Sequence, residues 1–266
     1  MKSIYKVFVA AIVLFSNSIY GQTRDRLPQV NKVFSIVVHV VKDSAGTNGM
    51  FGTTPDNAIA PQVQISVDSL NAHFAPIGVS FNVCEIRFIE NYWYLNISTS
   101  LNQANEMFAL YNAKNRINLY YVENINVSDT YFYKNSISSG ISNGGLILSS
   151  NSIKNTVHGF GHLFGLMDTD AGGNELVDGS NASTAGDMIT DTPADYPFNP
   201  VNMSDFISGC TYISEVKDIN DDYYMPLVGN AMSSYSSFCL CQSGFAFTQE
   251  QYKKMVSTYL QNPDAW

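Results

Sequence analysis

Two histidines stand four residues apart in Thr156–Asp168 (TVHGFGHLFGLMD), and this segment constrains the fold more than any other. On an α-helix, residues i and i+4 lie on one face, one turn apart, so the imidazoles of His158 and His162 can bind the same ion. This is the arrangement of two-histidine zinc sites on helices. The pair alone is as compatible with two ordinary surface or core histidines, because the spacing by itself is a weak signal.

The residues that follow the pair favour the metal site. Gly165 can adopt the left-handed conformation that ends a helix. The chain then turns back, and Asp168 can supply a carboxylate oxygen, which is an acceptable zinc ligand. We therefore expect a helix near Asn155–Leu166 whose end carries three zinc ligands. The other two histidines, His39 in an apolar strand and His73 on a helix, are expected to be structural.

The composition is that of an acidic globular protein with enough apolar residues for a core. The 266 residues are 45% hydrophobic, and 14 basic residues against 23 acidic ones give a net charge of −9. A surface that follows phosphate groups needs clustered basic residues, and none are present, so we expect no nucleic-acid partner.

Residues 1–21 have the pattern of a secretory signal peptide. Lys2 and Lys6 precede the apolar run Val7–Phe15, and a short polar stretch ends at the small residue Gly21. Nine apolar residues are too few to cross a bilayer, which needs about 20. We expect a secreted protein, extracellular or periplasmic, with no membrane attachment after cleavage.

Residues 22–266 are expected to form a single α+β domain with a mixed β-sheet, because strands and helices mix without strict alternation. The N-terminal half would end near residue 166, and a loop-rich C-terminal half would begin near residue 167. The expected strands are Phe34–Val41, Val79–Ile89, Ile117–Val122 and a short edge strand, Gly145–Leu148. Further helices are expected after Pro61, over Leu101–Asn112 and over Gln249–Leu260. Thr248 and Gln251 are expected to cap the last of these helices.

The four cysteines allow three pairings. Cys239 and Cys241 are too close in sequence to bond to each other without strain. Cys210 paired with either of them would close a loop of about 30 residues, which stabilises by roughly 3 kcal/mol. Cys84 lies in an apolar strand pattern and is expected to be a buried free thiol.

Around its histidines the chain resembles the pappalysin-like metzincins, the branch that includes ulilysin, with a degenerate form of the zinc motif HExxHxxGxxH. Six further pieces support the resemblance in order and approximate spacing: Phe34–Val41 (FSIVVHVV), Val67–Phe74 (VDSLNAHF), Gly186–Pro193 (GDMITDTP), Ser208–Cys210 (SGC), Asn230–Met232 (NAM) and Phe247–Met255 (FTQEQYKKM). Together they span most of residues 22–266.

The resemblance implies a zinc-dependent endopeptidase that acts on peptides or proteins. His158, His162 and Asp168 would bind Zn²⁺, and Met232 would be the Met-turn residue beneath the metal. Relatives also bind Ca²⁺, so acidic residues near Asp187 are candidates for a calcium site. The oligomeric state does not follow from the resemblance.

The chain departs from the family pattern at three positions. The third ligand is usually His, whereas here it is Asp168. Gly159 stands where a Glu should take a proton from the metal-bound water, and losing a general base typically costs about 10²–10⁴ in rate. Ser234 stands where relatives often carry Tyr. Either the turn carries an extra residue and Tyr235, one position later, takes that catalytic role, or the role is absent.

Two functions therefore remain from the sequence. The first is a secreted zinc metalloendopeptidase of weak or absent activity, in which another acidic residue such as Glu175 or Asp170 replaces the missing base. The alternative is a zinc-binding pseudoprotease that binds peptides or proteins and cleaves nothing. A purely structural zinc is disfavoured, because three protein ligands leave one coordination position open, as in catalytic sites.

Overall fold

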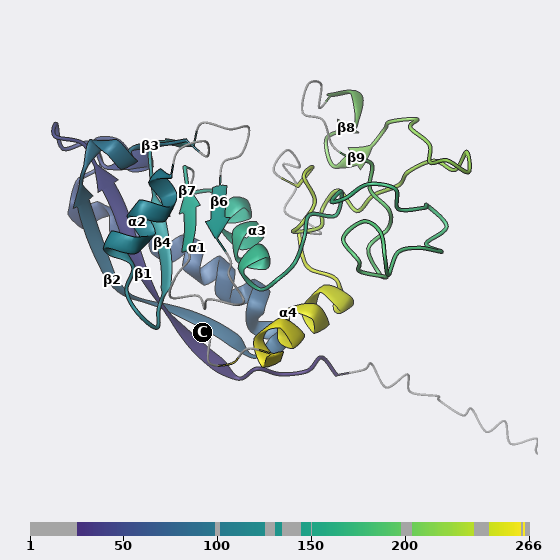
Figure 1. The fold of residues 1–266 in the computed structure, drawn as a ribbon, viewed down its shortest axis with the longest axis horizontal. Coiled ribbons are helices and arrows are strands. Elements are labelled where there is room, and N and C mark those ends of the chain that lie inside the picture. Colours follow the sequence, from purple (N-terminus) through teal and green to yellow (C-terminus); the bar gives the residue numbers. More distant parts are fainter. Residues whose placement is uncertain are drawn as a thin grey trace, which may run out of the picture.

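A five-stranded mixed sheet forms the core of the chain, in a computed structural model that describes residues 26–98, 102–125, 131–134, 145–149, 151–197, 204–236, 245–261 and 263. The strand order is β2-β1-β4-β7-β6 (Figure 1). The strands are β1 (Lys32–Lys42), β2 (Val79–Glu90), β4 (Ile117–Tyr121), β6 (Tyr131–Lys134) and β7 (Gly145–Leu148). All neighbouring pairs are parallel except β6 and β7, which are antiparallel, so the predicted α+β class with a mixed sheet is confirmed.

Four α-helices accompany the sheet: α1 (Ile59–Phe74), α2 (Gln103–Tyr111), α3 (Ile153–Leu163) and α4 (Gln249–Gln261). The remaining elements are short: the 3₁₀ turns η1 (Gly49–Phe51), η2 (Asp56–Ala58), η3 (Ala75–Ile77) and η4 (Tyr92–Tyr94), and the strand pairs β3 (Asn96–Ile97) with β5 (Asn124–Ile125) and β8 (Ile207–Ser208) with β9 (Thr211–Tyr212).

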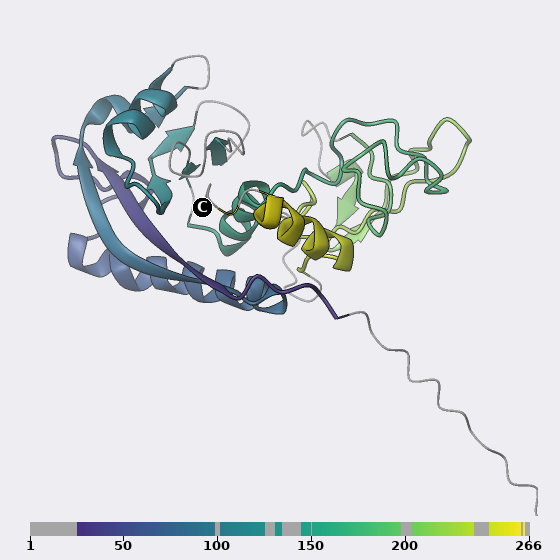
Figure 2. The same ribbon diagram turned by 60° about the horizontal axis from the view of Figure 1, so that its bottom comes forward.

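Helices cover both faces of the sheet, which explains why the segment of β1 reads as a continuous apolar run. Ile36, Val38 and Val40 belong to the core cluster that also holds buried residues of α1, α3 and α4. Val41 belongs to a second cluster, which includes Met107 of α2. Figure 2 shows α1 lying along one side of the sheet and α2 on the other.

The C-terminal half is rich in loops, as expected: between α3 and α4, β8 and β9 are the only named elements among the described residues. Figure 1 shows α4 returning beside α3, so the end of the chain packs against the N-terminal half. The division of residues 22–266 into two halves of one domain stays a prediction. The predicted signal peptide lies outside the described residues. No helix in the described part of the chain is long and apolar enough to cross a membrane.

Two expectations about the sheet were wrong. Gly145–Leu148 is not an edge strand, because β6 pairs with it on the outer side. Cys84 is free but exposed, not buried. It is the extra residue of a β-bulge, since Val83 pairs with Ile36 and Glu85 pairs with the next residue of β1. The Cys84 thiol donates to the carbonyl of Ile36 at 3.3 Å.

Helix α3 ends at Leu163, three residues before the predicted end, in a left-handed turn at Gly165 (φ +86°). The N–H of Leu166 donates to the carbonyl of Gly161 at 3.1 Å, and the N–H of Gly165 donates to that of His162 at 2.9 Å. These two bonds form a Schellman motif, which reverses the chain directly after the helix. An added Cβ at Gly165 would lie 2.6 Å from the hydroxyl oxygen of Thr258 on α4.

We predict that Gly165→Ala lowers the free energy of unfolding by more than the ~1–2 kcal/mol that a left-handed backbone costs an L-residue. The added methyl group also collides with Thr258, which α4 holds in place. Gly179→Ala is the matched control, because Gly179 has φ +71° and no atom within 4 Å of an added Cβ. Urea unfolding of both variants separates the two effects, and equal losses would contradict the role of the Thr258 contact.

Candidate metal centre

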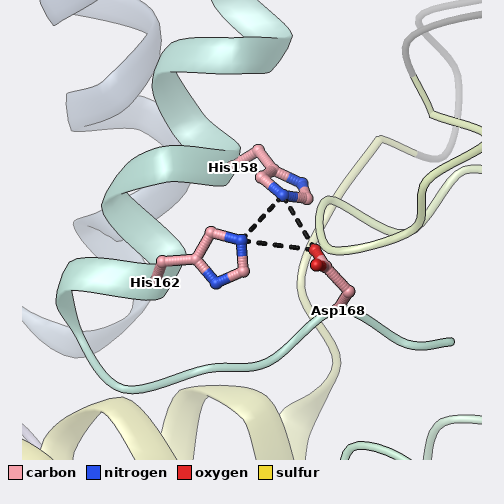
Figure 3. Close-up of side chains that lie close together, drawn as sticks. All are labelled: His158, His162 and Asp168. Carbon is pink, nitrogen blue, oxygen red and sulfur yellow. Dashed lines mark hydrogen bonds and ion pairs between the residues drawn. The ribbon is translucent and has the colours of Figure 1, made fainter. Parts of the chain in front are cut away.

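Three side chains converge at the end of α3 (Figure 3). The Nε2 atoms of His158 and His162 are 2.9 Å apart. An Oδ1 oxygen of Asp168 lies 2.9 Å from Nε2 of His158 and 3.3 Å from Nε2 of His162. Among the described residues, these three form the one group whose ligand atoms lie close enough together to share a metal ion.

The proton positions on the two imidazoles follow from their backbone contacts. Nδ1 of His158 lies 2.8 Å from the carbonyl oxygen of Ala231, and Nδ1 of His162 lies 2.9 Å from that of Leu166. A carbonyl oxygen can only accept, so each Nδ1 carries a proton and donates. In the neutral rings both Nε2 atoms then present lone pairs toward each other and toward Asp168.

A cation held among the three side chains would stabilise this arrangement. Two bare nitrogens and a carboxylate oxygen at these distances repel one another unless a positive charge lies between them. Ligand atoms about 2.0–2.1 Å from a tetrahedral zinc ion lie about 3.3 Å apart. The observed separations fit that geometry with a small expansion.

Met232, the predicted Met-turn residue, contacts α3 at Gly161, on the side opposite the contact of Gly159 with Leu146 of the sheet. Met232 is fully buried, and an added Cβ at Gly161 would overlap its sulfur atom. The amide of Gln251 on α4 exchanges two hydrogen bonds, of 2.9 and 3.1 Å, with the amide of Asn230. Asn230 in turn accepts from the N–H of Met232 at 2.8 Å. The Met-turn is therefore fixed by α4.

The same Gln251 side chain also forms the predicted cap of α4. Its Oε1 accepts from the N–H of Thr248 at 2.9 Å, while the Thr248 hydroxyl accepts from the N–H of Gln251 at 3.3 Å. This reciprocal pair is a capping box, so the prediction for Thr248 and Gln251 is confirmed. The sequence pattern predicted the cap but not the two hydrogen bonds between Gln251 and Asn230.

No side chain occupies the expected position of the general base, since Gly159 lies in the buried face of α3. Of the two residues named as substitutes, Asp170 accepts from the Ser234 hydroxyl at 3.0 Å. Glu175 is buried, with its carboxylate against Gly186. Neither belongs to the group that can share the metal ion.

Tyr235, the sequence candidate for a catalytic hydroxyl, is completely buried. Its ring packs against Tyr212 and Phe206, with ring centroids 5.7 and 6.2 Å apart. Burial raises the pKa of Tyr235 far above its usual range. Its catalytic role stays a prediction.

The two remaining histidines occupy structural positions, as expected. His39 is fully buried in the sheet, stacked on Tyr120 with ring centroids 4.2 Å apart and with Nε2 3.0 Å from Oδ1 of Asn118. Burial lowers the pKa of His39 to about 4, so the ring is neutral. His73 contacts the carbonyl oxygens of Ser69 and Phe245 and so links α1 to the segment before α4.

The predicted disulfide between Cys210 and either Cys239 or Cys241 stays a prediction, because both possible partners lie outside the described residues.

Among the described residues, three buried carboxyl groups lie in the C-terminal half: Glu175, Asp187 and Asp195. The sequence had indicated Glu175 as a substitute base and Asp187 as a calcium ligand, but gave no role to Asp195. Burial and the negative charge of Asp187 raise the pKa of Glu175 to about 7, and burial raises that of Asp187 to about 6. Burial, together with the charges of Asp170 and Glu175, raises the pKa of Asp195 to about 8. The hydroxyl of Thr169 donates to Asp195 at 2.7 Å. Asp195 therefore lies next to the segment that carries Asp168.

The fold is of the class expected from the sequence, a metzincin-like fold with a mixed sheet and a helix that carries the two histidines. The mature mirolysin of Tannerella forsythia, solved in complex with a cleaved peptide, has the same fold. Its TM-score is 0.58 at 17% sequence identity, and the match covers 87% of this chain and 93% of that one.

Sequence similarity also connects the chain with metalloproteases. Extracellular metalloproteases of Arthroderma benhamiae and Trichophyton verrucosum are each 26% identical over 164 residues, which is 56% of this chain. The chain matches about half the length of these relatives, 55% in each case. No protein-family model matches.

We predict that Asp195→Asn weakens the fall of stability with rising pH. A carboxyl group whose folded pKa is raised keeps its proton while the unfolded chain releases it, so stability falls between about pH 4 and pH 8. The fall is at most about 1.4 kcal/mol per pH unit for each such group. Asparagine can still accept from Thr169 and has no charge to bury.

Urea unfolding of the zinc-loaded protein from pH 5 to pH 8 measures this slope. Asp68→Asn, which changes an exposed carboxyl group on α1, is the matched control. A slope that stays the same in Asp195→Asn would show that Asp195 ionises without cost in the folded protein.

Proposed function

We propose that this chain is a secreted zinc-binding protein of the pappalysin-like metzincin branch that binds peptides at its metal centre and hydrolyses them slowly or not at all. The observation that carries the proposal is the convergence of two imidazole nitrogens and one carboxylate oxygen within 3.3 Å of one another. Similarity to extracellular metalloproteases supports both the metal and the class of ligand.

His158, His162 and Asp168 hold the ion, and three protein ligands leave a coordination position open for water or a peptide carbonyl. A bound zinc ion supplies Lewis acidity toward that group. The carbonyl oxygens of Ala231 and Leu166 keep both imidazoles in the tautomer that can bind metal. The Met-turn and α4 keep these carbonyl groups in place.

The proposed function has two versions, a slow peptidase and a pseudoprotease, and the glycine at position 159 leaves both open. An active peptidase needs a group that moves the proton of the attacking water, and position 159 supplies none. We propose turnover about 10²–10⁴ below that of a site with the base. If turnover is absent altogether, the protein is a pseudoprotease that uses the same open position to bind peptides.

The first test is metal content. We expect the purified protein to hold about one zinc ion per chain, and Asp168→Ala to bind zinc at least ~100-fold more weakly, because losing a mere supporting partner of a ligand already costs 10–100-fold. Asp68→Ala, on the exposed face of α1, should bind zinc like the parent. A folded parent protein that purifies without metal and does not take up zinc would refute the proposal.

We further propose that Ca²⁺ binds beside Glu175 and Asp187. Both carboxyl groups are buried, each has a raised pKa, and Oε1 of Glu175 has no hydrogen-bond partner among the described residues. Burying two negative charges together is costly unless a cation compensates them. Backbone carbonyl groups or water would have to complete the coordination.

Calcium titration of the zinc-loaded protein tests this second site. We expect the melting temperature to rise with CaCl₂ in the parent and to stay constant in Glu175→Gln, with zinc content unchanged in both. MgCl₂ at equal ionic strength controls for screening. Equal responses of parent and Glu175→Gln would rule out a calcium site at these residues.

A further inference from the structure

The core leaves no room for a side chain at position 159, where the general base would stand. Gly159 lies on the side of α3 that faces β7, where an added Cβ would be 2.7 and 2.8 Å from the two methyl carbons of Leu146 and 3.3 Å from its Cγ. Separations below 3.0 Å are essentially never seen for real Cβ atoms. Any side chain at position 159 therefore requires Leu146 to move.

Leu146 has little freedom to move. It is completely buried in the main core cluster. Its strand is held on both sides, because Leu146 pairs with Leu119 of β4 and with a residue of β6. The strand itself is tightly packed too, since an added Cβ at Gly145 would lie 2.8 Å from the carbonyl oxygen of Asn118. Close-packed interiors respond to added volume with strain.

We propose that Gly159 and Leu146 form an interlocking pair that excludes a general-base side chain from the metal centre. The inference rests on the proposed zinc site and deepens it, because the packing of α3 on the sheet then explains why no base stands at position 159. Restoring glutamate at position 159 alone would strain the core, whereas shortening Leu146 at the same time would make room. The atoms that block the position are Cγ, Cδ1 and Cδ2 of Leu146, and Leu146→Ala removes exactly those three.

Four proteins test the pair: the parent, Gly159→Glu, Leu146→Ala and the double variant. We expect each single change to lower the melting temperature and the double variant to melt higher than the sum of the two losses predicts. Chelator-sensitive cleavage of a mixed peptide library should rise about 10²–10⁴-fold over the parent in the double variant. In Gly159→Glu alone we expect no such rise.

A second double variant, Gly159→Glu with Leu148→Ala, is the matched control. Leu148 is also buried in the same core cluster and strand, but it is not among the atoms that an added Cβ at Gly159 would meet. Its melting temperature should be lower than the first double variant's, without a gain in cleavage.

The proposal is overturned if Gly159→Glu alone melts like the parent or cleaves as fast as the double variant. It is also overturned if both double variants recover melting temperature and cleavage to the same extent. The third contrary result is a Leu146 double variant that binds zinc and does not cleave peptides. The zinc content of the parent reports separately on the proposed function, and the melting temperatures of the metal-free proteins report on the packing pair whether or not zinc binds.

Discussion

Repulsion among three electron-rich atoms is the constraint on which the end of α3 depends. Two imidazole nitrogens whose protons are committed elsewhere face a carboxylate oxygen, and the largest separation among the three is 3.3 Å. In a buried setting this repulsion is weakly screened, so the arrangement favours an ion at its centre. The remaining features of the site are ways of holding these atoms together.

The groups that hold these three side chains in place come both from the turn directly after α3 and from distant parts of the chain. The turn at Gly165 brings Asp168 back toward the helix, and the carbonyl of Leu166 in that turn fixes the tautomer of His162. The carbonyl of Ala231 does the same for His158, and Gln251 holds the Met-turn through Asn230. Helix α4 therefore supports the candidate metal centre although it supplies none of the three converging side chains.

Local sequence patterns predicted the parts of this arrangement that depend on local geometry. The four-residue spacing places two imidazoles on one helical face, a glycine permits the reversal, and Thr248 forms a cap with Gln251 three positions later. The apolar run of β1 likewise predicted a strand buried on both faces. Each of these inferences needs only the geometry of one element.

The parts that the sequence did not predict depend on contacts between elements. Cys84 is exposed because of a bulge in the pairing of β2 with β1, and no pattern within β2 marks the extra residue. β7 is an inner strand because β6 pairs with it, although β6 gave no strand signal. The burial of Glu175 and Asp195 depends on how the loops of the C-terminal half pack, and no local pattern predicts it.

The two glycines of α3 show why a motif and its structural setting have to be considered together. Within one helix, Gly159 and Gly161 each weaken the element by about 1 kcal/mol relative to alanine. In the folded chain they are contact positions on opposite sides: Gly159 faces Leu146 of the sheet, and Gly161 faces Met232. The second contact preserves the metal centre, whereas the first occupies the space of the base. A helix seated this closely on its sheet can retain the metal ligands while excluding the residue that would make them hydrolytic.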